Sequence, residues 1–281
     1  MTQTKLILVE GIPGSGKTST ARYIKGLLDA HDKDNHLYLE GDLNHPADYE
    51  SVACLDFKEY EVLKNKYSEL GDIINPFTQT VRQYRLIYYG KLQQQIPIDQ
   101  YKSLVDELAG LDVYNGSLDR YQELVIERWT EFVSHTQLTE RIVILECCFL
   151  QNPLTMMLGR FNQSQQVIND FLKRLETIIQ PLHPKIIYFY QDDIRSTISR
   201  VTQERSEDWL RHITWYFTEQ GFGKANGYHG VDGLCEVLKV RKEYELDIMD
   251  HLKIDKLTIN NTEFDLEHVL QEVRGFLELA H

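Results

Sequence analysis

The chain has 281 residues, of which 42% are hydrophobic and 26% are charged, and its formal net charge is −13 at pH 7. This acidity opposes broad binding to nucleic acid backbones, and no apolar stretch approaches the length of a membrane span, so we expect neither partner. The N-terminus enters an apolar run without a basic and apolar leader, which favours a cytoplasmic protein with one core and insertions.

Five short segments rich in Ile, Val, Leu and Tyr have the length of β-strands. They are residues 5–9, 36–39, 141–145, 185–190 and 256–259. Helical patterns separate these segments, as in a mostly parallel sheet with helices on both faces. We therefore predict an α/β fold with a five-stranded, mostly parallel sheet.

The first predicted strand runs into a segment with the pattern of a phosphate-binding loop, and a helical pattern follows it. Glycines let successive backbone N–H groups point at one anion, and the helix N-terminus behind them favours negative charge. In such a loop Lys17 reaches the β- and γ-phosphates and Thr18 binds Mg²⁺. The predicted ATP contacts are Gly11, Pro13, Gly14, Ser15, Gly16, Lys17, Thr18 and Ser19. No Asn-Lys-x-Asp guanine signature follows a predicted strand, so ATP is preferred to GTP.

Two acidic residues follow the second and third predicted strands. Asp42 lies in the segment Glu40-Gly41-Asp42, and Glu146 ends the apolar run 141–145. Ligands of open α/β sheets bind at the carboxyl ends of the strands, so both acids are candidates for the site. Either acid can accept a proton or support Mg²⁺, and the sequence does not rank them. The alternative for Asp42 is a loop residue that caps the next helix.

The predicted helix after the fourth strand carries Arg200 and Arg205, about one turn apart. A guanidinium stacks on a base and also forks onto phosphate oxygens, so each arginine suits a nucleotide site. The alternative for each is a solvated helix face. Asn261 and Thr262 leave the fifth strand, and Asp265 is expected to cap the last helix.

These motifs together resemble the phosphate-loop kinases of small molecules and nucleotides, a group that includes thymidylate, adenylylsulfate and gluconate kinases and chloramphenicol phosphotransferase. The resemblance implies a three-layer P-loop NTPase fold and an enzyme that transfers the γ-phosphate of ATP to a small-molecule hydroxyl or a nucleotide phosphate. Thymidylate kinases have an Asp-Arg pair after the third strand, whereas this chain has Cys147-Cys148-Phe149 there, which argues against thymidylate as the acceptor.

The resemblance also implies roles for the candidate residues. Asp42 would lie beside the acceptor hydroxyl, and Glu146 would orient Mg²⁺ or act as the base. One arginine, Arg200, would stack on adenine, and Arg205 would meet the migrating phosphoryl group. The loop at Asn261 and Thr262 would contact the edge of the base.

Residues 46–135 and 206–252 are longer than a crossover between parallel strands requires, and we predict both to be helical insertions. The first would bind the acceptor, helped by Asn44 and His45 and by Arg82 and Arg85, which we expect about a helical turn apart. The alternative is an ordinary amphipathic helix with surface arginines. The segment 206–252 would form a helical lid.

Two other classes of function stay open. One is a P-loop ATPase or nucleotide-dependent switch that acts on a protein partner, and the other is a protein that only binds nucleotide. The sequence identifies neither the acceptor nor the oligomeric state.

Overall fold

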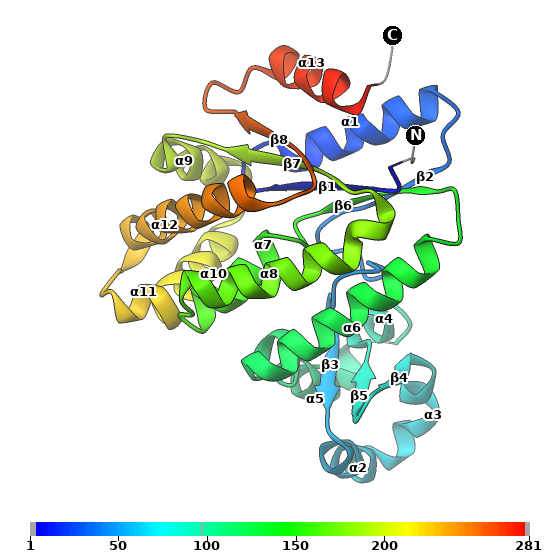
Figure 1. Cartoon of the computed structure of the whole chain (residues 1–281). Helices are drawn as coiled ribbons and strands as arrows, with labels where there is room; N and C mark the ends of the chain where they lie inside the picture. The colour runs from blue at the N-terminus through cyan, green and yellow to red at the C-terminus, as the bar shows by residue number, and fades with distance from the viewer. Residues whose placement is uncertain (1–3, 97, 279–281) are drawn as a thin grey trace. The chain divides into compact units, whose positions relative to one another are not determined.

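The computed structural model describes residues 4–96 and 98–278 (Figure 1). The chain divides into two compact units, the first comprising Met1–Glu40 and Trp129–His281 and the second comprising Gly41–Arg128. Among the described residues, no helix is both long and apolar enough to cross a membrane.

The first unit is built on a five-stranded sheet that is parallel throughout, in the order β2-β6-β1-β7-β8. Its strands are β1 Leu6–Gly11, β2 Asn35–Tyr38, β6 Ile142–Glu146, β7 Lys185–Tyr190 and β8 Asp255–Asn260. The central strand β1 is buried along its whole length, so nearly all of its residues are apolar. The predicted five-stranded α/β fold is confirmed, with strands at all five predicted positions.

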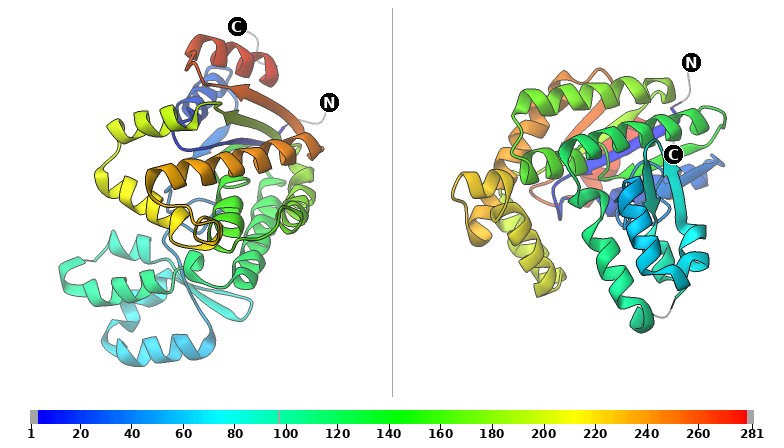
Figure 2. Two further views of the ribbon diagram at one scale, coloured as in Figure 1. Left: turned by 90° about the vertical axis from the view of Figure 1, so that its left-hand side faces the viewer. Right: turned by 90° about the horizontal axis from the view of Figure 1, so that it is seen from below.

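Helices cover both faces of this sheet, with α1 and α13 on one face and α8 and α12 on the other (Figures 1 and 2). This arrangement is compatible with a three-layer α/β fold. The helices of this unit are α1 Lys17–Ala30, α7 Gln151–Leu154, α8 Gln165–Ile179, α9 Ile194–Glu204, α10 Glu207–Thr218, α11 Gly221–Ala225, α12 Gly230–His251 and α13 Leu266–Leu277. The segment 206–252 is therefore helical, as predicted.

Apolar residues on α1 and α13 form a core with the sheet. Ile24 of α1 and Val273 of α13 are fully buried, and they belong to one cluster with Ile7, Ile144 and Phe189 of the strands. Burial of such side chains stabilises the packed arrangement by roughly 1.5–3 kcal/mol each. Asp265 caps α13 by accepting a hydrogen bond from the backbone N–H of His268 at 3.0 Å, as the sequence predicts.

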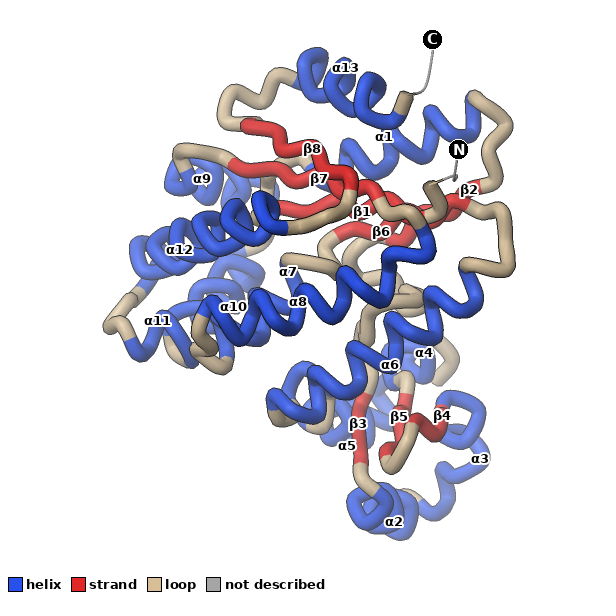
Figure 3. Tube along the Cα trace, in the orientation of Figure 1, coloured by secondary structure: helices blue, strands red, loops and turns tan. Residues whose placement is uncertain are grey.

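The second unit contains a three-stranded antiparallel sheet of order β3-β5-β4, as well as helices (Figure 3). Its elements are β3 Ala53–Leu55, α2 Phe57–Lys66, α3 Gly71–Ile74, β4 Thr78–Val81, β5 Tyr84–Ile87, α4 Tyr89–Gln93, α5 Ile98–Gly110 and α6 Leu118–Thr136, the last of which continues into the first unit. We expected the segment 46–135 to be helical. This expectation is wrong where the segment forms β3, β4 and β5.

The helix expected around Arg82 and Arg85 is a β-hairpin. Strands β4 and β5 are joined by Arg82 and Gln83, and Arg82 has a φ of 53°, in the left-handed region. Tight hairpin turns are usually marked by Gly, Asn or Asp, and neither turn residue here is one of these. The sequence consequently lacks the signal that would have indicated the hairpin.

Candidate functional site

The segment that begins at the last residue of β1 has three positions whose backbone conformation favours glycine. Gly11, Gly14 and Gly16 have φ values of 144°, 76° and 101°. A Cβ atom on Gly11 would lie 2.4 Å from the carbonyl oxygen of Phe189, and one on Gly14 would lie 2.1 Å from Cγ2 of Val201. We call residues 11–16 the glycine loop; it leads directly into α1, so the unpaired N–H groups of the first helical turn lie at its end.

Two polar side chains of this segment are buried within it. Lys17 is 6% exposed, and its Nζ donates to the carbonyl oxygen of Ile12 at 2.9 Å. The hydroxyl of Ser15 is buried without a partner among the described residues. Buried polar groups in native proteins are normally hydrogen-bonded, so an ammonium at the start of α1 and an unpaired hydroxyl in the adjoining loop suit an anionic ligand.

Thr18 and Glu146 meet beside the glycine loop. The register of β1 and β6 sets Glu146 opposite Val9, and the Oγ1 of Thr18 donates to Oε1 of Glu146 at 2.6 Å. Hydroxyl and carboxylate oxygens are ligands that Mg²⁺ accepts, and Mg²⁺ usually takes one or two protein ligands and completes its shell with phosphates and water. The pair therefore fits a magnesium ion that is shared with a nucleotide. The described residues contain no cluster of three or more His, Cys, Asp or Glu side chains that could hold a metal.

Arg200 and Asn261 also contact the glycine loop, from α9 and from the exit of β8. Nη2 of Arg200 donates to the carbonyl oxygen of Gly14 at 2.7 Å, and Nδ2 of Asn261 donates to that of Ser15 at 2.9 Å. The guanidinium of Arg200 lies over the ring of Phe264, 3.0 Å from the ring centroid. The structure thus brings together the predicted loop, Glu146, Arg200 and Asn261, and it adds Phe264, which no motif indicated.

Two further predicted site residues, Arg205 and Thr262, contact residues outside the glycine loop. Arg205 is exposed at the end of α9, with its guanidinium 5.9 Å from the ring centroid of Trp209. The hydroxyl of Thr262 accepts the backbone N–H of Asp192 at 2.9 Å and donates to Asn260, which stabilises the turn after β8. Neither of these contacts involves the glycine loop.

Glu10, the residue before the glycine loop, is a buried carboxylate that the sequence prediction did not include. It is 0% exposed, and its two oxygens accept the backbone N–H groups of Phe149 at 2.7 Å and Gln151 at 2.9 Å. Burial raises the pKa of Glu10 to about 7; the nearby charge of Glu245 also raises it, while the backbone donors act in the opposite direction. Glu245 itself accepts from the buried Arg241 at 2.7 Å.

In the second unit, Asp42 lies in a turn and not at the end of a strand. Strand β2 ends at Tyr38, and Oδ1 of Asp42 accepts the backbone N–H of Asn44 at 2.8 Å. This contact closes a turn, and no helix begins there, because the next helix is α2 Phe57–Lys66 with Asp56 as its cap. The alternative that Asp42 caps the next helix is therefore wrong. His45 is only 2% exposed, and its Nδ1 accepts the N–H of Ala47 at 3.2 Å. Burial lowers the pKa of His45, which favours its neutral form.

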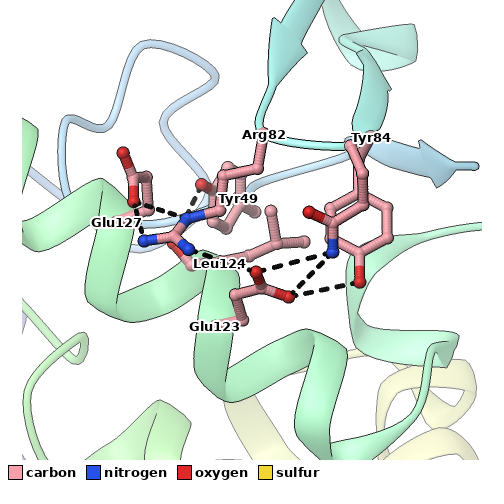
Figure 4. Close-up of polar contacts among 7 residues, drawn as sticks. Tyr49, Arg82, Tyr84, Glu123, Leu124 and Glu127 are labelled. Carbon is pink, nitrogen blue, oxygen red and sulfur yellow. Dashed lines mark hydrogen bonds and ion pairs between the residues drawn. The ribbon is translucent and has the colours of Figure 1, made fainter.

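The charge of Arg82 is balanced inside the second unit (Figure 4). Its Nε donates to Oε2 of Glu127 at 2.8 Å, and its Nη1 to Oε1 of Glu123 at 3.4 Å. Arg85, on β5, lies 6.0 Å from the ring centroid of Tyr60. The two arginines therefore do not form the helical pair that the sequence predicted, and Arg82 already has two carboxylate partners.

No family model matches this chain, and a search of curated proteins finds no match. The function therefore has to be inferred from the residues of the site.

Proposed function

We propose that this protein is a cytoplasmic, magnesium-dependent phosphotransferase that moves the γ-phosphate of ATP to a hydroxyl of a small molecule. The observation that carries the proposal is the 2.6 Å contact of Thr18 with Glu146 at the end of the glycine loop. A hydroxyl on the first turn of a helix and an acid at the end of the neighbouring strand are the two protein oxygens that a phosphate-bound Mg²⁺ needs.

The residues around this pair would share the work of phosphoryl transfer. Backbone N–H groups of the glycine loop and of the start of α1 would bind the phosphates, and Lys17 would stabilise the charge that develops in transfer. A bound Mg²⁺ would neutralise phosphate charge. Arg200, which already contacts the glycine loop, would hold the nucleotide.

The acceptor is proposed to be a hydroxyl compound, and a nucleotide phosphate is the less favoured choice. An acceptor rich in phosphate needs unpaired cations, but Arg82 is engaged by Glu123 and Glu127. Asp42, Asn44 and Arg85 stay as proposed acceptor contacts in the second unit. A carboxylate, either Asp42 or Glu146, would accept the proton of the attacking hydroxyl.

The proposal is tested by incubating the protein with γ-labelled ATP, Mg²⁺ and a pool of small metabolites, and by analysing the products by mass spectrometry. We expect one metabolite to gain a phosphoryl group, and Lys17→Ala to prevent this gain. ATP hydrolysis that is independent of any metabolite would favour the ATPase or switch instead. Tight ATP binding without turnover would indicate a protein that only binds nucleotide.

Arg200→Ala is expected to weaken ATP binding about tenfold, because a charged hydrogen bond to the glycine loop is worth roughly 1.5–3 kcal/mol. The matched control is Arg205→Ala at the C-terminal end of the same helix, which removes an exposed guanidinium that lies over the ring of Trp209. Isothermal titration with ATP and Mg²⁺ measures both affinities. A larger loss for Arg205→Ala than for Arg200→Ala would reverse the roles proposed for the two arginines.

A further inference from the structure

Two consecutive residues at the end of β1 hold the chain that leaves β6. The carbonyl oxygen of Val9 accepts the N–H of Cys147 at 3.1 Å. The carboxylate of Glu10 then accepts the N–H groups of Phe149 at 2.7 Å and Gln151 at 2.9 Å. The segment 147–151 is thus fixed at three points, immediately after Glu146.

The same two residues directly precede the glycine loop, because Gly11 follows Glu10. The segment 147–151 turns sharply, since Cys147 has a φ of 69°, a conformation that costs energy in a residue other than glycine. A turn of this kind persists only when its surroundings hold it. Here the carboxylate of Glu10 accepts two backbone N–H groups on the far side of the turn, where the side chain of Gln151 also donates to Glu40 at 2.8 Å.

The choice of a carboxylate is informative because a buried charge is costly. If Glu10 served only to fill space, an apolar residue of similar size would suffice. A carboxylate offers two acceptor oxygens, whereas a glutamine amide offers one acceptor oxygen and one donor group, so only the carboxylate gives each N–H group an acceptor oxygen of its own.

We propose that Glu10 is a positioning residue that holds Glu146 against Thr18 and so sets the magnesium affinity of the site. This inference rests on the proposed function. Glu10 would not contact the ligand; it ties the start of the glycine loop to the segment 147–151. Thr18 follows that loop on the first turn of α1, and Glu146 directly precedes that segment at the end of β6. Loss of groups that orient metal ligands typically costs roughly 10- to 100-fold in metal affinity.

The test is the Mg²⁺ dependence of ATP binding by the whole chain, measured by isothermal titration at pH 8.5, above the raised pKa of Glu10. Mg²⁺ is expected to enhance ATP binding, and in Glu10→Gln the Mg²⁺ concentration that gives half of this enhancement should rise about tenfold or more. The affinity for ATP without Mg²⁺ should stay close to that of the wild type. Glu10→Asp keeps the charge but has a shorter reach, and we expect an intermediate shift.

The matched control is Glu176→Gln. Glu176 is another carboxylate with low exposure, 8%, that accepts a backbone N–H, that of Lys253, but it lies on α8 outside the site. We expect Glu176→Gln to lose thermal stability without a change in the Mg²⁺ dependence of ATP binding. This result would separate a positioning role of Glu10 from a general effect of removing a buried carboxylate.

An unchanged Mg²⁺ dependence in folded Glu10→Gln would overturn the positioning role while leaving the proposed function intact. If Glu10→Gln does not fold, Glu10→Asp decides by the same criterion. A wild-type protein that does not bind ATP at any Mg²⁺ concentration would overturn the proposed function itself, and the role of Glu10 with it.

Discussion

Lys17→Ala is expected to lower the rate of phosphoryl transfer by roughly 10²- to 10³-fold or more, because a preorganised cation at the migrating phosphate acts in the transition state. The fold should survive, since the Lys17 ammonium donates to the carbonyl oxygen of Ile12, five residues away in the adjoining glycine loop. The measurements are kcat with the acceptor found in the metabolite screen and a thermal melt by circular dichroism.

The control for this variant is Lys25→Ala on the same helix, which removes an exposed lysine paired with Asp29. We expect Lys25→Ala to keep wild-type turnover. A folded Lys17→Ala protein with near-normal turnover would exclude the glycine loop as the site of phosphate binding.

Asp42→Asn and Glu146→Gln are expected to fail in different ways. If Asp42 is the base, its amide variant should lose roughly 10²- to 10⁴-fold in kcat with little change in ATP affinity. Glu146→Gln should instead raise the Mg²⁺ concentration needed for activity, because its carboxylate contacts Thr18. A magnesium titration of kcat and KM for both variants distinguishes these outcomes.

Thr18→Ala removes the other proposed magnesium ligand and is compared with Glu146→Gln. If the two residues bind one ion, the effects of Thr18→Ala and Glu146→Gln on Mg²⁺ affinity should be less than additive in the double variant. The roles of the two acids would be exchanged if Asp42→Asn raised the Mg²⁺ concentration needed for activity and Glu146→Gln lowered kcat without changing that concentration.

The sheet and the glycine loop could be predicted because their signals are local. Strand β1 is a continuous apolar run since it is buried on both faces, and the residue spacing of the glycine loop is fixed by its backbone conformation.

Other features depend on contacts that are distant in sequence. The buried role of Glu10 depends on backbone groups about 140 positions away, and the stacking of Arg200 depends on Phe264. The Asp42 turn and the Arg82 hairpin were missed for a different reason: the loop after β2 is longer than expected, and the two-residue turn lacks the usual glycine or asparagine. The type of a single residue does not show which distant residue its side chain will contact.

The most direct test of the central claim is equilibrium binding of ATP to the whole wild-type chain with and without Mg²⁺. Residues 11–18 and Glu146 are proposed to form a single Mg²⁺–ATP site, so we expect ATP to bind, and to bind more tightly when Mg²⁺ is present. Lys17→Ala should weaken binding under both conditions, and Thr18→Ala should mainly remove the enhancement by Mg²⁺. A folded protein that does not bind ATP, or that binds it equally well with and without Mg²⁺ and in both variants, would contradict the proposed site.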